Sequence, residues 1–229
     1  MSAKTPVATK LNDKPQERRE IILDAALELF IKQGYEGTSI DQIRQASGFK
    51  SKASLYTHFQ SKEEVSHALI ANIFEKIQQV VIKADTAADR NALQRFMAVF
   101  RAYIQWGLTH REEFVFRIIR AQELRMLAGK YDFQSDSSLH PTNLYLRFID
   151  ILESLRHQKY PVREIKNAAL FHLTIGAICR AAIDLDSFCM AGDDESLASD
   201  AQGTSEIAAQ VEQILAVCIG IVFTHSPLS

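Results

Sequence analysis

The sequence predicts an all-α protein with a small helix-turn-helix domain followed by a larger helical domain, about nine helices in total. Three observations support this fold class. Apolar residues recur at helical spacing in successive segments, no segment shows the alternation expected of a strand, and residues typical of helix ends separate the segments. The chain has 229 residues, of which 47% are hydrophobic, which is ample for a packed core.

The first expected helix runs from Glu17 to Gln33. Within it Ile22, Ala26 and Phe30 are spaced four residues apart and form one apolar stripe. The glycine that follows Gln33 suits the left-handed residue with which many helices end. The preceding residues 1–15 are polar and contain three lysines, so we expect a disordered basic tail there.

The stretch from Thr38 to Phe59 predicts two short helices joined by a tight turn. Thr38 and Asp41 resemble a capping box that opens the first of these helices. Gly48 stands where the chain must turn sharply, and Ser51 is a suitable N-cap for the second helix. This arrangement is typical of a helix-turn-helix that places its second helix in the DNA major groove.

The outer face of the second helix carries cations and hydroxyl groups. Lys and His side chains can contact phosphate oxygens, and Ser, Thr and Tyr hydroxyls can donate hydrogen bonds to them. Lys62 lies in a capping box, Ser61 to Glu64, beside the exposed backbone N–H groups of another helix start. We assign Lys52, Tyr56, His58 and Lys62 mainly to phosphates, Lys50, Ser54 and Thr57 to base edges or phosphates, and Thr38 and Ser51 to further DNA contacts.

These segments resemble, in order and spacing, the N-terminal domain of the tetracycline-repressor (TetR) family. The matching words are ILDAALELF at 22–30, GYEGTSIDQIRQASG at 34–48, KASLYTHF at 52–59 and SKEEV at 61–65. The resemblance implies a DNA-binding domain at 16–62 and a ligand-binding and dimerisation domain at 63–229. It also implies a DNA-binding transcriptional regulator, with repression as the first expectation and activation as an alternative.

The net charge of −2 does not exclude DNA as a partner. Residues 1–60 carry nine Lys or Arg against seven Asp or Glu, so the excess of negative charge lies in the rest of the chain. A local positive patch is sufficient for phosphate contact.

The remainder of the chain predicts further helices separated by polar breaks. Thr109 and Glu112 resemble a capping box, and Pro141 and Pro161 suit first helical positions. We expect a long helix at 62–83 that links the domains, a break at 84–89, helices at 91–108, 112–128, 141–157, 161–190 and 204–224, and loops at 130–139 and 192–203.

The last helix has a heptad-like seam, formed by Ile207, Val211, Ile214, Cys218 and Ile221. Small residues in the preceding helix allow close approach of a neighbour. We expect the helices at about 162–190 and 204–224 to form a four-helix homodimer interface, as the family resemblance also implies; alternatively, both helices fill the monomer core. A dimer would read a palindromic operator whose half-sites lie about 34–36 Å apart.

Aromatic and Met side chains gather on the middle helices, as expected for an apolar ligand cavity or for a filled core. The family resemblance favours a cavity that takes a small apolar or amphipathic effector, which would release the operator. The candidate lining residues are Phe96, Phe100, Tyr103, Trp106, Phe116, Met126, Tyr145, Phe148 and His172.

Other functional classes lack sequence support. The chain has no P-loop, GxGxxG or HExxH motif, and its seven histidines and three cysteines show no metal-ligand spacing. We therefore expect no catalytic residues, no metal and no cofactor, and hence no enzyme. The rival class is an all-helical adaptor that binds protein through a degenerate helix-turn-helix. No signal peptide and no membrane-spanning apolar stretch is evident, so we expect a cytoplasmic protein without a membrane partner.

Overall fold

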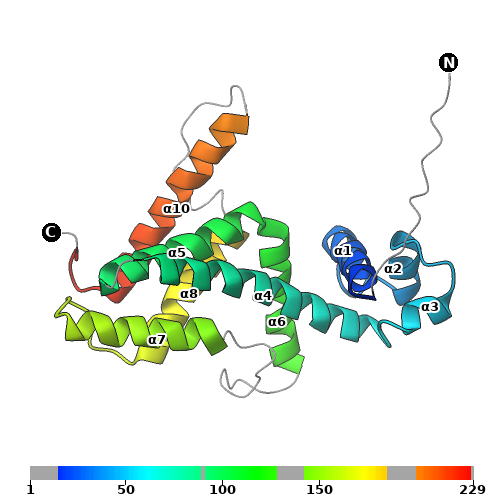
Figure 1. The fold of residues 1–229 in the computed structure, drawn as a ribbon, viewed down its shortest axis with the longest axis horizontal. Helices are drawn as coiled ribbons and strands as arrows, with labels where there is room; N and C mark the ends of the chain where they lie inside the picture. The colour runs from blue at the N-terminus through cyan, green and yellow to red at the C-terminus, as the bar shows by residue number, and fades with distance from the viewer. Residues whose placement is uncertain (1–14, 89–90, 128–141, 185–199, 228–229) are drawn as a thin grey trace. The chain divides into compact units, whose positions relative to one another are not determined.

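The structure is a computed structural model that describes residues 15–88, 91–127, 142–184 and 200–227. These residues form nine helices, which confirms the all-α prediction (Figure 1). The helices are α1 (Pro15–Gln33), α2 (Ile40–Ala46), α3 (Lys52–Tyr56), α4 (Lys62–Ala87), α5 (Ala92–Thr109), α6 (Arg111–Leu127), α7 (Thr142–His157), α8 (Asn167–Ile183) and α10 (Asp200–Val222). The chain divides into two compact units, Met1–Leu69 and Ile70–Ser229.

The first unit packs α1, α2, α3 and the beginning of α4 around a small apolar core. Ile22, Phe30, Ile43, Leu55 and Phe59 are all buried there. Helix α1 ends as expected, because the next residue is a glycine with φ of 77° whose N–H donates to the backbone oxygen of Phe30 over 3.0 Å. Helix α3 is held against this core by its buried residue Leu55.

The start of α2 differs from the sequence prediction. Ser39, and not Thr38, is the N-cap, and it forms the capping box with Gln42. The Thr38 hydroxyl instead donates to the backbone oxygen of Gly34 over 2.8 Å. The predicted box is wrong because the buried Thr38 side chain closes the α1–α2 turn, which leaves the next hydroxyl to cap the helix.

The second unit is built around α5, which packs against α6, α7, α8 and α10 (Figure 1). Most of α5 is buried, including Phe96, Phe100 and Tyr103. Asn91 caps this helix by accepting hydrogen bonds from the backbone N–H groups of Leu93 and Gln94.

Helix α4 continues to Ala87, so the predicted polar break is wrong over residues 84–87. Asp85 is buried there and accepts hydrogen bonds from Arg95 of α5, at 2.8 and 3.2 Å, and from Arg147 of α7. Arg95 also donates to Asp150 at 2.8 Å. A polar residue that local sequence marks as a helix breaker is thus held in the helix by partners from two other helices.

Two further helix starts also differ from expectation. The hydroxyl of Thr109 donates to the backbone oxygen of Gln105 in its own helix, so it closes α5 and does not cap α6. Residues 161–166 are not helical, because Pro161 accepts a backbone hydrogen bond from Thr224 and Val162 pairs with Phe223 in an isolated antiparallel bridge.

Other expected boundaries fall partly outside the described residues. The predicted loop at 192–203 is wrong for 200–203, which belong to α10, and its earlier part is outside. The expected loop at 130–139, the proline at 141, Cys189 and the tail before Pro15 are also outside. Pro15 itself begins α1.

One segment in the described part of the chain, Ser205–Val222, is long and apolar enough to cross a membrane by length and composition. Buried helices of globular proteins meet the same criterion. One third of this segment is buried within its own unit, and it packs against α5 and α8.

Candidate DNA-binding site

The turn before α3 is fixed by a glycine and an arginine. Gly48 has φ of 75°, which places it in the left-handed region that suits glycine. Arg44 donates to the backbone oxygen of Phe49 over 2.6 Å, and its Nε lies 2.8 Å from Asp41 Oδ1. That hydrogen bond also holds the pKa of the Asp41 carboxyl below its usual value. Ser51 then caps α3 by accepting a hydrogen bond from the N–H of Ser54.

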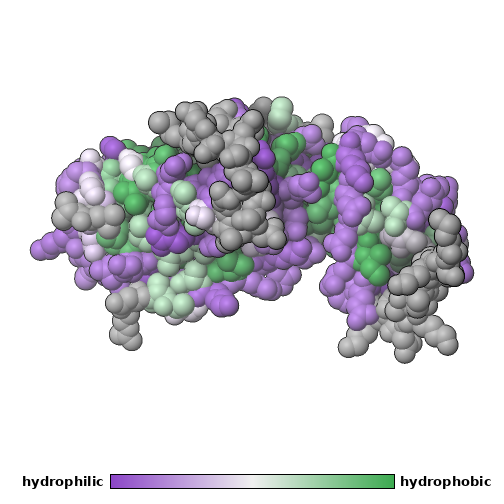
Figure 2. All heavy atoms as spheres, turned by 90° about the horizontal axis from the view of Figure 1, so that it is seen from above, coloured by the Kyte–Doolittle hydropathy of each residue, from purple (hydrophilic) through white to green (hydrophobic). Residues whose placement is uncertain are grey.

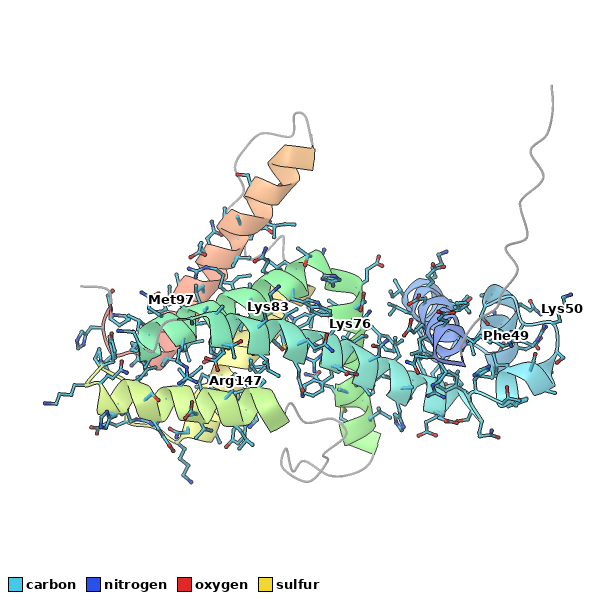
Figure 3. All side chains as sticks on the ribbon, in the orientation of Figure 1. Phe49, Lys50, Lys76, Lys83, Met97 and Arg147 are labelled. Atoms are coloured by element: carbon cyan, nitrogen blue, oxygen red, sulfur yellow. The ribbon has the colours of Figure 1, made fainter. Side chains whose placement is uncertain are left out.

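This framework presents two lysines at the end of the unit. Lys50 extends away from the helices beside Phe49 in Figure 3 and is exposed. The side chain of Lys52 is 68% exposed, and its ammonium lies 3.9 Å from Asp41 Oδ1, at the outer limit of an ion pair. Both cations can therefore reach a phosphate without breaking a short contact.

The hydroxyl groups of α3 differ in their availability. Ser54 and Thr57 donate to backbone oxygens one turn earlier, Ser51 and Ser54, over 2.7 and 2.8 Å. The exposed Tyr56 ring stands on the same short helix. The phenol of Tyr56 is thus better placed to donate to DNA than the two hydroxyls that already donate within the helix.

Lys62 and Thr38 occupy different surroundings from those expected. Lys62 Nζ donates to the backbone oxygen of Tyr35 over 2.8 Å and lies 4.1 Å from the centre of the Tyr35 ring. Only 22% of its side chain is exposed. Thr38 is 2% exposed, so its side chain cannot reach a duplex. We therefore leave Thr38 out of the contact surface proposed below.

His58 is positioned by Arg19, a residue that the sequence pattern did not single out. Arg19 Nη1 donates to the His58 backbone oxygen over 2.6 Å, and its guanidinium carbon lies 4.0 Å from the centre of the Phe59 ring. Burial, followed by the charges of Arg18 and Arg19, lowers the pKa of His58 below 6.5. This shift disfavours the charged form of the His58 ring, so the ring is less suited to a charged phosphate contact than Lys50 or Lys52.

Most of the expected cavity lining fills the core of the second unit. Phe96 and Phe100 pack with ring centres 4.7 Å apart, and Phe100 and Phe148 with centres 5.5 Å apart. Met126, by contrast, is 71% exposed, and His172 is also exposed. The remaining candidates, in chain order, are Tyr103 and Trp106, which are buried, and Phe116 and Tyr145, which are half-buried.

A surface groove of about 390 Å³ on α7 contains none of these aromatic candidates. Its lining residues are Asp150, Glu153, Ser154, His157 and Gln158.

Across the described ranges no group of three or more His, Cys, Asp or Glu side chains is arranged to hold a metal ion. Burial raises the pKa of the Cys218 thiol to about 12, as expected for a cysteine that serves as a small apolar residue.

Comparison with known proteins finds a family match over the part of the chain that holds the candidate site. Residues 22–69, which include α2, α3 and the turn between them, match the family described as bacterial regulatory proteins, tetR family. The chain is 29% identical over 151 residues to the biofilm operon icaADBC HTH-type negative transcriptional regulator IcaR of Staphylococcus aureus (strain Newman), a match that covers 58% of this chain and 80% of IcaR.

Solved structures share the fold of most of the chain. The ketosteroid transcriptional regulator KstR2 of Mycobacterium tuberculosis is similar with a TM-score of 0.64 and 18% identity, over 96% of this chain and 100% of that one. AibR in complex with isovaleryl coenzyme A and operator DNA is similar with a TM-score of 0.62 and 19% identity, over 90% and 98% of the two chains. The chain therefore carries a domain of the tetR family of bacterial regulatory proteins at residues 22–69, and it shares the fold of solved regulators of this family.

Proposed function

We propose that the chain is a repressor that binds a palindromic operator as a homodimer in the cytoplasm. The observation that supports this most directly is the pair of exposed lysines, Lys50 and Lys52, near Tyr56. The turn and the helix that carry them are held by hydrogen bonds from Arg44 and by the Ser51 cap. An adaptor that binds only protein has no need of this cationic surface. The contact set is Lys50, Ser51, Lys52, Ser54, Tyr56, Thr57 and His58, with Lys62 at its edge.

We propose repression, rather than activation, from the names of similar proteins. IcaR is named as a negative transcriptional regulator, and AibR has been crystallised with operator DNA. An activator would use the same DNA-contacting face, so the geometry of α3 supports DNA binding, and the likeness to IcaR supports repression.

Dimerisation is proposed through α8 and α10, although not through the seam expected from sequence. Val211, Ile214 and Cys218 are buried within their own unit, where α10 packs against α5 and α8. Leu173 of α8 and Val217 of α10 are exposed large apolar side chains. Apolar patches interrupt the hydrophilic surface of the larger unit in Figure 2.

Two glycines support the same surface. A Cβ atom added to Gly176 of α8 or to Gly220 of α10 would meet no atom of the described residues within 4 Å. Small residues in the open on two neighbouring helices allow the backbone of another helix to approach closely. We therefore propose that the outer faces of α8 and α10 meet their copies in a second subunit.

An effector bound in the second unit would act through α4, which contributes residues to both units. Because only differential affinity shifts a conformational population, the effector must bind the DNA-free form more tightly. The apolar or amphipathic character of the effector is proposed from the aromatic surroundings of α5.

A reporter gene fused to the DNA that flanks the chain's own gene tests repression. Output should fall when the wild-type chain is present and recover with the Lys50→Ala/Lys52→Ala double variant, expressed at the same level. Higher output with the wild type would establish the activator. Equal output with both proteins, together with equal binding to this DNA and to random DNA, would contradict the proposal.

A further inference from the structure

Arg117 of α6 places a cation against the interior of the second unit. Its Nη2 donates to the hydroxyl of Tyr103 on α5 over 3.2 Å, and Tyr103 is buried. The Nε of Arg117 is also buried and has no hydrogen-bond partner among the residues that the structure describes. A guanidinium offers five N–H donors, so this side chain retains donors that no described residue uses.

The charge of Arg117 is not balanced by a neighbouring carboxylate. Within the described residues, no Asp or Glu oxygen lies within 4.0 Å of its nitrogens. Two acids of its own helix are engaged elsewhere, Glu113 with Lys76 at 3.0 Å and Glu123 with Arg120 at 2.9 Å. A partly buried cation without an anionic partner lowers the stability of the fold, so a ligand anion that pairs with the guanidinium would bind favourably.

The surroundings of Arg117 are aromatic. Its guanidinium carbon lies 5.6 Å from the centre of the Phe114 ring. That ring lies 6.3 Å from Trp106 and packs on Gly107, where an added Cβ would come within 3.1 Å of it. Apolar walls beside a few polar groups are typical of a site for an amphipathic small molecule.

The Tyr103 hydroxyl can contribute to the same site. Its oxygen accepts the hydrogen bond from Arg117, and its own hydrogen has no acceptor among the described residues, so the hydroxyl can donate to a ligand. Burial raises the pKa of Tyr103, so this phenol keeps its hydrogen at physiological pH.

We propose that Arg117, with Tyr103 beside it, anchors the acidic group of the effector, a carboxylate or a phosphate. The apolar part of the ligand then lies toward the aromatic side chains of α5 and α6. This inference rests on the proposed function in one respect, that the bound molecule acts as the effector.

The test uses the full chain and Trp106, which is its single tryptophan. Octanoate, octyl phosphate and octan-1-ol are titrated separately while Trp106 fluorescence is followed. At least one of the two anions should bind about 10-fold or more tightly than the alcohol, in line with a charge-assisted hydrogen bond. Octanoate alone would identify a carboxylate, and octyl phosphate alone would identify a phosphate.

Arg117→Gln should abolish the preference for anions and leave binding of the alcohol unchanged. Arg101→Gln is the matched control, because Arg101 of α5 is paired with Glu212 at 2.5 Å, and it should keep the preference. Absence of anion binding, equal binding of the alcohol, or a preference that survives in Arg117→Gln would overturn the proposal.

A second variant tests the site without any ligand. Arg117→Met removes an unbalanced charge and keeps an apolar stem, so the melting temperature should rise by about 2 °C or more. A lower melting temperature would show that Arg117 is a structural residue and would overturn the proposal. Release of the operator is measured in a separate DNA-binding assay. If anions bind through Arg117 without releasing DNA, the anion site stands, but its coupling to DNA binding is contradicted.

Discussion

Lys50 and Lys62 illustrate how side chains of one type take different roles within a single small unit. Both stand near the predicted recognition helix, and the sequence pattern assigns both to DNA. The exposed Lys50 fits that assignment, whereas Lys62 donates to the backbone oxygen of Tyr35, 27 positions earlier. Local sequence cannot reveal such a partner, because the contact exists only after α1, α2 and α4 have packed together.

The two lysines should therefore respond differently to substitution. Lys50→Ala should reduce the slope of log K against log salt concentration by about one unit, with an unchanged melting temperature. Lys62→Ala should lower the melting temperature, because the α1–α2 turn loses its contact from α4. DNA-binding titrations at several salt concentrations, with melting curves for both variants, measure these effects. An unchanged salt slope for Lys50→Ala would remove that residue from the phosphate contacts.

The lowered pKa of His58 predicts a pH dependence of stability. Burial and the charges of Arg18 and Arg19 disfavour the protonated ring in the folded state, so the unfolded chain binds more protons below about pH 6.5. The contribution of His58 is therefore complete above pH 6.5 and is lost as the pH falls toward its folded-state pKa. Melting curves from pH 8 to 5 should show a smaller decline for His58→Gln than for the wild type. Parallel curves would contradict this prediction.

At the scale of helices, the sequence identified ends that depend on local chemistry. The glycine at the end of α1, the turn glycine at 48 and the Ser51 cap are confirmed, because each satisfies a requirement within a few residues of itself. The predicted C-terminal end of α4 and the predicted start of α8 were wrong. Asp85 holds α4 through arginines on two later helices, and Pro161 accepts a backbone hydrogen bond from Thr224, so both outcomes depend on contacts distant in sequence.

The buried carboxylate that joins α4 to α5 and α7 should be important for stability. Burial disfavours the charged form, but the hydrogen bonds from Arg95 and Arg147 outweigh it and hold the pKa of Asp85 below its usual value. Asp85→Asn should lower the free energy of unfolding by about 3 kcal/mol, because the partly buried guanidinium groups of Arg95 and Arg147 lose the charge of their shared buried partner. Urea unfolding measures this loss.

Asp150→Asn is the matched control within the same network. The Asp150 side chain is largely exposed, and its pairing with Arg95 is screened by solvent. It should cost less than about 1 kcal/mol. Equal losses of unfolding free energy in the two variants would show that burial does not make the Asp85 ion pairs more important for stability than the exposed Asp150 pair.

For the whole molecule, the sequence predicted the all-α fold class and the order of the two units, because helical periodicity and the helix-turn-helix motif are local signals. It did not distinguish a ligand cavity from a core. Phe96, Phe100 and Phe148 have the same spacing whether they line a cavity or pack on one another, and here they pack. Arg117 was missed because nothing in its neighbourhood along the chain shows that it faces Tyr103.

The proposed dimer surface gives a prediction with a closely matched control. Leu173 of α8 is 56% exposed and Leu146 of α7 is 57% exposed. Leu173→Glu should convert the dimer to a monomer at micromolar concentration, because it places a charge in an apolar interface, and Leu146→Glu should not. Light scattering coupled to gel filtration reports the mass. A monomeric wild type, or a dimer that persists in Leu173→Glu, would contradict the assignment.

The most direct test of the central claim is selection from a pool of random duplex DNA by the full-length chain, followed by titration of the enriched sequence. The account predicts a palindromic motif with half-sites about one helical turn apart, bound about a thousandfold or more tightly than random DNA and weakened by salt. It also predicts that the Lys50→Ala/Lys52→Ala variant loses this binding. Enrichment of no motif, with equal and weak binding to every duplex, would contradict the account and favour the adaptor.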